Sequence, residues 1–111
     1  MALRHLEFSF SGVNGAAIPR EWSHSGVVGS GDMEVLIYRK EQNGSVTVKV
    51  CTPVTGFDEV WEKVLQRFVV ESRCGDLDLY INDNNATPFI VNLRLHQALQ
   101  EARGDLIDGL C

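Results

Sequence analysis

A serine lies between two glycines at Gly29-Ser30-Gly31, and an acidic residue, Asp32, follows directly. Glycine has no side chain to block an approaching molecule, and it adopts backbone angles that other residues avoid. The Ser30 hydroxyl is therefore predicted to be accessible to a large reactant, either as a nucleophile or as the acceptor of a covalent modification. A plain turn is the alternative, because Gly-Ser-Gly is a common loop composition.

Catalysis by Ser30 would require a base and an orienting carboxylate, and His24 and Asp32 have the right residue types. A nucleophile elbow has the spacing Gly-x-Ser-x-Gly between a strand and a helix. Ser30 lacks that spacing, and the residues after it resemble a strand. We therefore predict no catalytic residues in this chain, and a small hydrolase is the least favoured interpretation.

Metal and phosphate sites are also not predicted. The three histidines are far apart and have no paired ligand spacing. Cys51, Cys74 and Cys111 form no CxxC pair, so we expect two packing thiols and one at the terminus. The glycine-rich turn has neither a P-loop lysine nor the spacing of a dinucleotide-binding fingerprint.

Length and charge narrow the class of protein. The 111 residues suffice for one modest domain, which we place at 1–104, with 105–111 as a mobile tail. The formal net charge of −5 disfavours nucleic acid as a partner. No apolar run approaches the roughly 20 residues that cross a bilayer, and the first residues are charged. We therefore expect a cytoplasmic protein without a membrane partner.

Two stretches have the periodicity of amphipathic helices. In 57–70, six apolar residues recur at helical spacing. The helix expected at 89–103 follows Thr87-Pro88, a typical N-cap and first-turn proline, and Gly104 is a typical C-terminal stop. The six residues that form the apolar stripe in 57–70 are Phe57, Val60, Trp61, Val64, Leu65 and Phe68.

Alternating or β-branched runs predict strands around these helices. Asn43-Gly44 is a strong hairpin signal, so the runs on either side of it are expected to pair as an antiparallel hairpin directly after Ser30. Residues 11–26 are expected to form a loop anchored by Trp22. The strands are predicted at 3–10, 33–38, 45–51 and 77–82, with a short one at 27–28. The expected fold class is α+β, a small mainly antiparallel sheet with both helices packed on one face.

Two distant segments resemble the malonate decarboxylase delta subunit, a dedicated acyl carrier protein. Residues 28–36, VGSGDMEVL, are similar to the family's G-S-G-D-L-E-V-L segment. Residues 86–95, ATPFIVNLRL, are similar to its A-T-P-x-x-V-x-L-R-L segment, and 46–54 match more loosely. With the spacing between them, these segments extend the resemblance over about 26–103.

The resemblance implies a role for Ser30. In the family, the serine at this position carries 2′-(5″-phosphoribosyl)-3′-dephospho-CoA through a phosphodiester, and a separate prosthetic-group transferase attaches it. The terminal thiol of this arm carries acetyl and malonyl groups as thioesters. Gly29 and Gly31 are expected to support the attachment site. Asp32 is expected to orient the turn or to help the transferase bind, and the alternative is a solvated carboxylate.

The resemblance also implies partners. It makes the chain a non-catalytic subunit that serves acyltransferase, malonyl transferase and decarboxylase subunits, which hold the active sites. Two alternatives stay open at this point. The chain could be the gamma subunit of a citrate lyase-type complex, which uses a related arm, or an adaptor that scaffolds enzymes without a covalent group.

Overall fold

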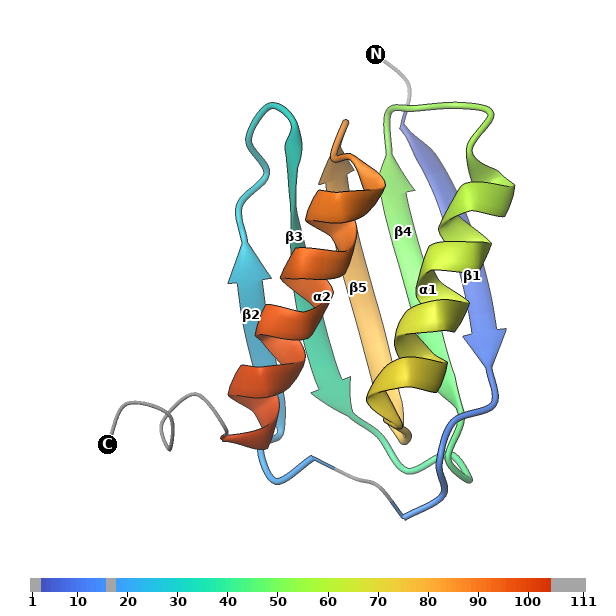
Figure 1. The fold of residues 1–111 in the computed structure, drawn as a ribbon, viewed down its shortest axis with the longest axis vertical. Helices are drawn as coiled ribbons and strands as arrows, with labels where there is room; N and C mark the ends of the chain where they lie inside the picture. The colour runs from blue at the N-terminus through green and yellow to red at the C-terminus, as the bar shows by residue number, and fades with distance from the viewer. Residues whose placement is uncertain (1–2, 16–17, 105–111) are drawn as a thin grey trace.

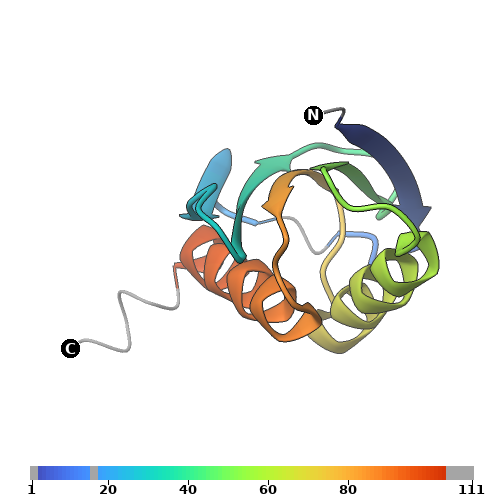
Figure 2. The ribbon, with the colours of Figure 1, turned by 90° about the horizontal axis from the view of Figure 1, so that it is seen from above.

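The computed structural model describes residues 3–15 and 18–104, which form two layers. One layer is a five-stranded sheet, and the other consists of two helices that lie side by side on one face of it (Figure 1). The view from above separates the layers (Figure 2). This is the predicted α+β class. In chain order the elements are β1 (Arg4–Phe10), β2 (Trp22–Gly26), β3 (Asp32–Arg39), β4 (Val46–Thr52), α1 (Asp58–Ser72), β5 (Leu77–Asn84) and α2 (Pro88–Arg103).

The strand order is β1-β4-β5-β3-β2, and only the β4–β5 pair is parallel. The predicted hairpin between β3 and β4 is therefore wrong, because β5 lies between them. Asn43 and Gly44 do turn the chain with positive φ values of 56° and 84°. The turn is held by Asp76, whose Oδ1 accepts the backbone N–H groups of Gln42 at 3.0 Å and of Gly44 at 2.8 Å. The chain thus reverses here onto the start of β5, and β4 pairs with β5 instead of β3.

The segment around β2 departs from prediction. Trp22–Gly26, expected to be loop, is an edge strand that pairs with β3 from Trp22↔Tyr38 to Gly26↔Glu34. The polar residues of β2 did not predict a strand. Ser23 is nevertheless buried, and it donates a hydrogen bond to the Ala98 carbonyl at 2.7 Å. The short strand expected at 27–28 belongs instead to the exposed β2–β3 turn. Trp22 is 57% exposed and does not anchor a loop as expected.

The core lies between the sheet and the helices. Strands β3, β4 and β5 direct alternate apolar residues toward the helices. The sequence alternation of β4 and β5 predicts this, whereas the β3 run was predicted from its apolar and β-branched composition. Trp61 packs in this core as expected, whereas Phe57 and Val60 of the same predicted stripe are 50% and 39% exposed. The largest fully buried side chains are Phe68, Met33, Ile37, Leu65, Leu77, Leu79, Ile81, Leu95, Leu99, Val35, Val46 and Val48.

The ends of α2 confirm their sequence signals. Thr87 is the N-cap, and its side chain accepts the backbone N–H of Ile90 at 3.3 Å. Pro88 occupies the first turn, and Gly104 closes the helix in the left-handed conformation at φ 79°. Helix α1 begins at Asp58, within one residue of the prediction. The tail predicted at 105–111, with Cys111, lies outside the described residues.

Candidate functional site

Ser30 lies in the exposed turn that joins β2 to β3, at one end of the sheet. The turn is tight, because the Asp32 N–H donates to the Gly29 carbonyl at 3.0 Å. Gly31 has a φ of 76°, yet a Cβ there would meet nothing within 4 Å. This glycine is therefore needed for its backbone angle, and the space beside Ser30 is open. Ser30 itself is exposed.

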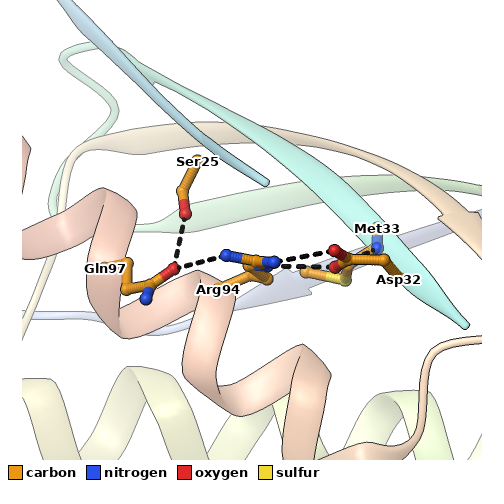
Figure 3. Close-up of polar contacts among 5 residues, drawn as sticks. All are labelled: Ser25, Asp32, Met33, Arg94 and Gln97. Carbon is orange, nitrogen blue, oxygen red and sulfur yellow. Dashed lines mark hydrogen bonds and ion pairs between the residues drawn. The ribbon is translucent and has the colours of Figure 1, made fainter. Parts of the chain in front are cut away.

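Asp32 forms a two-point ion pair with Arg94 of α2. Arg94 donates from Nε to Oδ1 at 3.0 Å and from Nη2 to Oδ2 at 2.7 Å (Figure 3). The Met33 N–H also donates to Oδ1, at 2.7 Å. The hydrogen bonds from Arg94, and then that from Met33, lower the pKa of Asp32 from its ordinary value. Asp32 is thus an ionised, partnered group beside the turn, and the alternative of a solvated carboxylate is not what the structure contains.

Further hydrogen bonds connect Arg94 to β2. Gln97, one turn further along α2, accepts hydrogen bonds from Arg94 Nη1 and from the Ser25 hydroxyl, each at 3.0 Å (Figure 3). The network therefore joins β2, α2 and β3 around the base of the turn. Sequence reasoning missed these three residues. Arg94 lies in the family-like segment 86–95 but was given no role there, and Ser25 and Gln97 had no signal beyond their polar residue types, which are also typical of solvated positions.

Two backbone contacts fix the turn further. The Gly31 N–H donates to the Asn84 carbonyl at the end of β5, at 2.8 Å. At Gly26, where φ is 84°, an added Cβ would lie 2.0 Å from the Met33 oxygen and 3.1 Å from Arg94 Cδ. Gly26 thus lets α2 and β3 approach β2 closely, and it is a supporting glycine that the sequence did not single out.

The residues of the other candidate sites are not brought together among the residues that the structure describes. His24 Nε2 lies 3.0 Å from Glu34 Oε2, and Glu34 also accepts a hydrogen bond from Asn82 at 2.8 Å. With Asp32 held by Arg94, both triad candidates have partners other than Ser30. Within 3–15 and 18–104, no three His, Cys, Asp or Glu residues are grouped to hold a metal ion. No helix in the described part of the chain could cross a membrane.

Comparison with known proteins gives a consistent result. The family model described as Malonate decarboxylase delta subunit (MdcD) matches residues 20–102. A malonate decarboxylase acyl carrier protein from Malonomonas rubra is 48% identical over 101 residues, which span 91% of this chain and 90% of the relative. One from Acinetobacter calcoaceticus is 44% identical over 80 residues, 72% of this chain and 78% of the relative.

A solved structure extends the match to the fold. One chain in the crystal structure of a Pseudomonas malonate decarboxylase hetero-tetramer in complex with malonate superposes with a TM-score of 0.75. The two chains are 34% identical, and the match covers 89% of this chain and 98% of that one. The family match includes both the Ser30 turn and Arg94. This chain therefore belongs to the malonate decarboxylase delta subunit family, the acyl carrier proteins of malonate decarboxylase.

Proposed function

We propose that this chain carries acetyl and malonyl thioesters for a malonate decarboxylase, on an arm attached to Ser30. The arm is 2′-(5″-phosphoribosyl)-3′-dephospho-CoA, joined to the serine oxygen by a phosphodiester. The observation that carries the proposal is the exposure of Ser30 in a rigidly held turn, in a chain that belongs to this carrier family. When bound, the arm supplies a thiol on which an acyl group is held as a thioester.

The residues around Ser30 fit such a group. Open space at Gly31 leaves room for a bulky substituent on the neighbouring hydroxyl. A phosphodiester bears a negative charge, and a free carboxylate at Asp32 would repel it. Arg94 neutralises that carboxylate through two hydrogen bonds. Ser30 thus lies beside an ion pair whose two charges balance. That ion pair connects β3 to α2.

The carrier itself is proposed to be non-catalytic. Its partners would be the acyltransferase, malonyl transferase and decarboxylase subunits, which hold the active sites, and the prosthetic-group transferase, which recognises the turn. Support comes from the similar chain of the Pseudomonas enzyme, which is part of a hetero-tetramer in complex with malonate. A long tether raises the local concentration of the acyl group at each active site without new contacts. We place this carrier in the cytoplasm.

The test is covalent loading. The chain is co-expressed with the prosthetic-group transferase and its precursor-forming enzyme, and the intact mass is measured. We expect the wild-type protein and the control Ser11→Ala, an exposed serine far from the turn in sequence, to gain the mass of the arm. Ser30→Ala should stay unmodified. An arm on the Ser30→Ala protein would disprove the assignment.

A second measurement separates a carrier from an adaptor. Each variant is assembled with the other decarboxylase subunits, and release of carbon dioxide from malonate is followed. Complexes with Ser30→Ala should have no activity, whereas those with Ser11→Ala should match wild type. Full activity with Ser30→Ala would mean that the chain acts as a non-covalent scaffold.

A further inference from the structure

An apolar pocket of about 290 Å³ lies between the starts of the two helices. Val60, Trp61 and Val64 of α1 form one wall, and Val91 of α2 lies on the other. Phe57 and Val60 leave 50% and 39% of their surfaces exposed here, although they continue the apolar stripe of α1. Large apolar side chains lining a concave site are typical of a site that receives a ligand.

The polar atoms of the wall limit what can enter. The Asp83 carboxylate lines the pocket, but it already accepts the Thr52 hydroxyl at 2.8 Å and the Ala86 N–H at 2.9 Å. A buried carboxylate has no hydrogen to donate to a second anion, and its negative charge repels that anion. The pocket therefore suits a small neutral group and disfavours a carboxylate.

The pocket and Ser30 lie at the same end of the molecule. The β2–β3 turn, the β5–α2 turn and the start of α1 are all at the top of Figure 1. The Gly31 N–H binds the Asn84 carbonyl at 2.8 Å, and the next residues along the chain, Asn85 and Ala86, line the pocket. One turn of backbone thus separates the attachment site from the pocket. A group tethered at Ser30 is present there at a high effective concentration.

We propose that this pocket receives the acetylated thiol end of the arm carried by the same chain and excludes the malonylated end. The inference rests on the proposed attachment to Ser30. An acetyl thioester is neutral and largely apolar, so its burial among valines and Trp61 is favourable. A malonyl thioester ends in a carboxylate, whose burial beside the Asp83 carboxylate is costly. The carrier thus shelters the acetyl form from water and leaves the malonyl form exposed to the decarboxylase.

The test compares four forms of the full chain: unmodified, free thiol, acetylated and malonylated. Intact mass first verifies that the arm is on Ser30. Two-dimensional ¹H–¹⁵N NMR then follows the indole N–H of Trp61, and that of Trp22, 57% exposed on β2, is the internal reference. We expect acetylation to shift the Trp61 and Val91 signals and to leave Trp22 unchanged. Malonylation should return the Trp61 signal to its position in the unmodified chain.

Hydrolysis of the acetyl thioester in mild base gives a second readout. An arm buried nine-tenths of the time would be hydrolysed about tenfold more slowly than a free one. Val60→Glu places a charge at the partly exposed rim, so it should abolish both the protection and the Trp61 shift. The matched control is Val70→Glu on the same helix, where the side chain is 66% exposed and does not line the pocket. It should retain both.

The outcomes separate the two proposals. Absence of the arm from Ser30 would overturn the attachment itself. A loaded chain whose Trp61 signal ignores acetylation, or whose thioester hydrolyses equally fast in wild type and Val60→Glu, would overturn the pocket alone. Equal Trp61 shifts from acetyl and malonyl groups would overturn the exclusion of the carboxylate.

Discussion

Arg94 donates two hydrogen bonds to the carboxylate of Asp32, at 3.0 and 2.7 Å, across 62 residues of sequence. Asp32 belongs to segment 28–36 and Arg94 to segment 86–95, the two stretches that carry the family resemblance. The ion pair brings these segments together beside Ser30. Their spacing in the sequence therefore has a physical meaning, because helix α2 supplies the cation that fixes the start of β3.

Replacing Arg94 with glutamine should loosen the Ser30 turn. Glutamine cannot donate two charge-assisted hydrogen bonds to Asp32, so local opening becomes easier. Amide hydrogen exchange at Gly31 should accelerate on the order of tenfold. Under the proposed function, loading of Ser30 by the transferase should also slow. Arg67→Gln is the control, since Arg67 pairs with Glu71 on the exposed side of α1, with side chains 77% and 52% exposed. Unchanged exchange in Arg94→Gln would show that the ion pair does not hold the turn.

Asp76→Asn should reduce stability in a pH-dependent manner. Backbone N–H groups of Gln42 and Gly44 lower the pKa of Asp76 in the folded protein. A carboxyl group whose pKa is lower in the folded state than in the unfolded state stabilises the fold at pH values above its unfolded-state pKa. This stabilisation is lost as the pH falls through its folded-state pKa. Urea unfolding should therefore show the largest difference between wild type and variant near neutral pH, and the difference should narrow below about pH 4.

The control for Asp76 is Glu41→Gln, which changes an exposed carboxylate in the same connection. Its effect on the free energy of unfolding should be small at every pH. If the free energies of unfolding of wild type and Asp76→Asn instead differed by the same amount at every acidic pH, that result would contradict a role for the charge of Asp76 in holding the turn.

Two leucines on α2 should differ sharply in their contribution to stability. Leu99 is 2% exposed in the core, whereas Leu93 on the same helix is 37% exposed. Leu99→Ala should lower the free energy of unfolding by about 2–5 kcal/mol, because it removes buried methyl groups and leaves a cavity. Leu93→Ala should cost less than about 1 kcal/mol. Equal losses in urea unfolding would contradict the orientation of α2.

Local patterns predicted most of the elements because each pattern reflects a local physical cause. Thr87-Pro88 begins α2 because the hydroxyl satisfies a free N–H and proline needs none. Valine alternation marks β4 because one face of the strand is buried. Strand β2 was not predicted because edge strands tolerate polar side chains. The contact that buries Ser23 is with Ala98 of α2, 75 residues away.

Pairing between strands depends on distant residues, so it was the least predictable feature. Asn43-Gly44 correctly marked a turn, but the turn binds Asp76, and β5 then separates β3 from β4. The same distinction between local and distant residues applies to the candidate site. Ser30 and its glycines were identified from their own neighbourhood. Arg94 belongs to the family-like segment 86–95, but its pairing with Asp32 depends on the packing of α2 beside β3.

The central position of β5 has a consequence for biosynthesis. Ser30 emerges from the ribosome early, but its turn is bound to Asn84, the last residue of β5. A nascent chain that ends before β5 has a sheet split into two unconnected halves and no carbonyl to hold Gly31. The Ser30 turn, the proposed attachment site, is thus among the last features of the protein to be completed. An enzyme that recognises the folded turn would discriminate a finished carrier from an incomplete one.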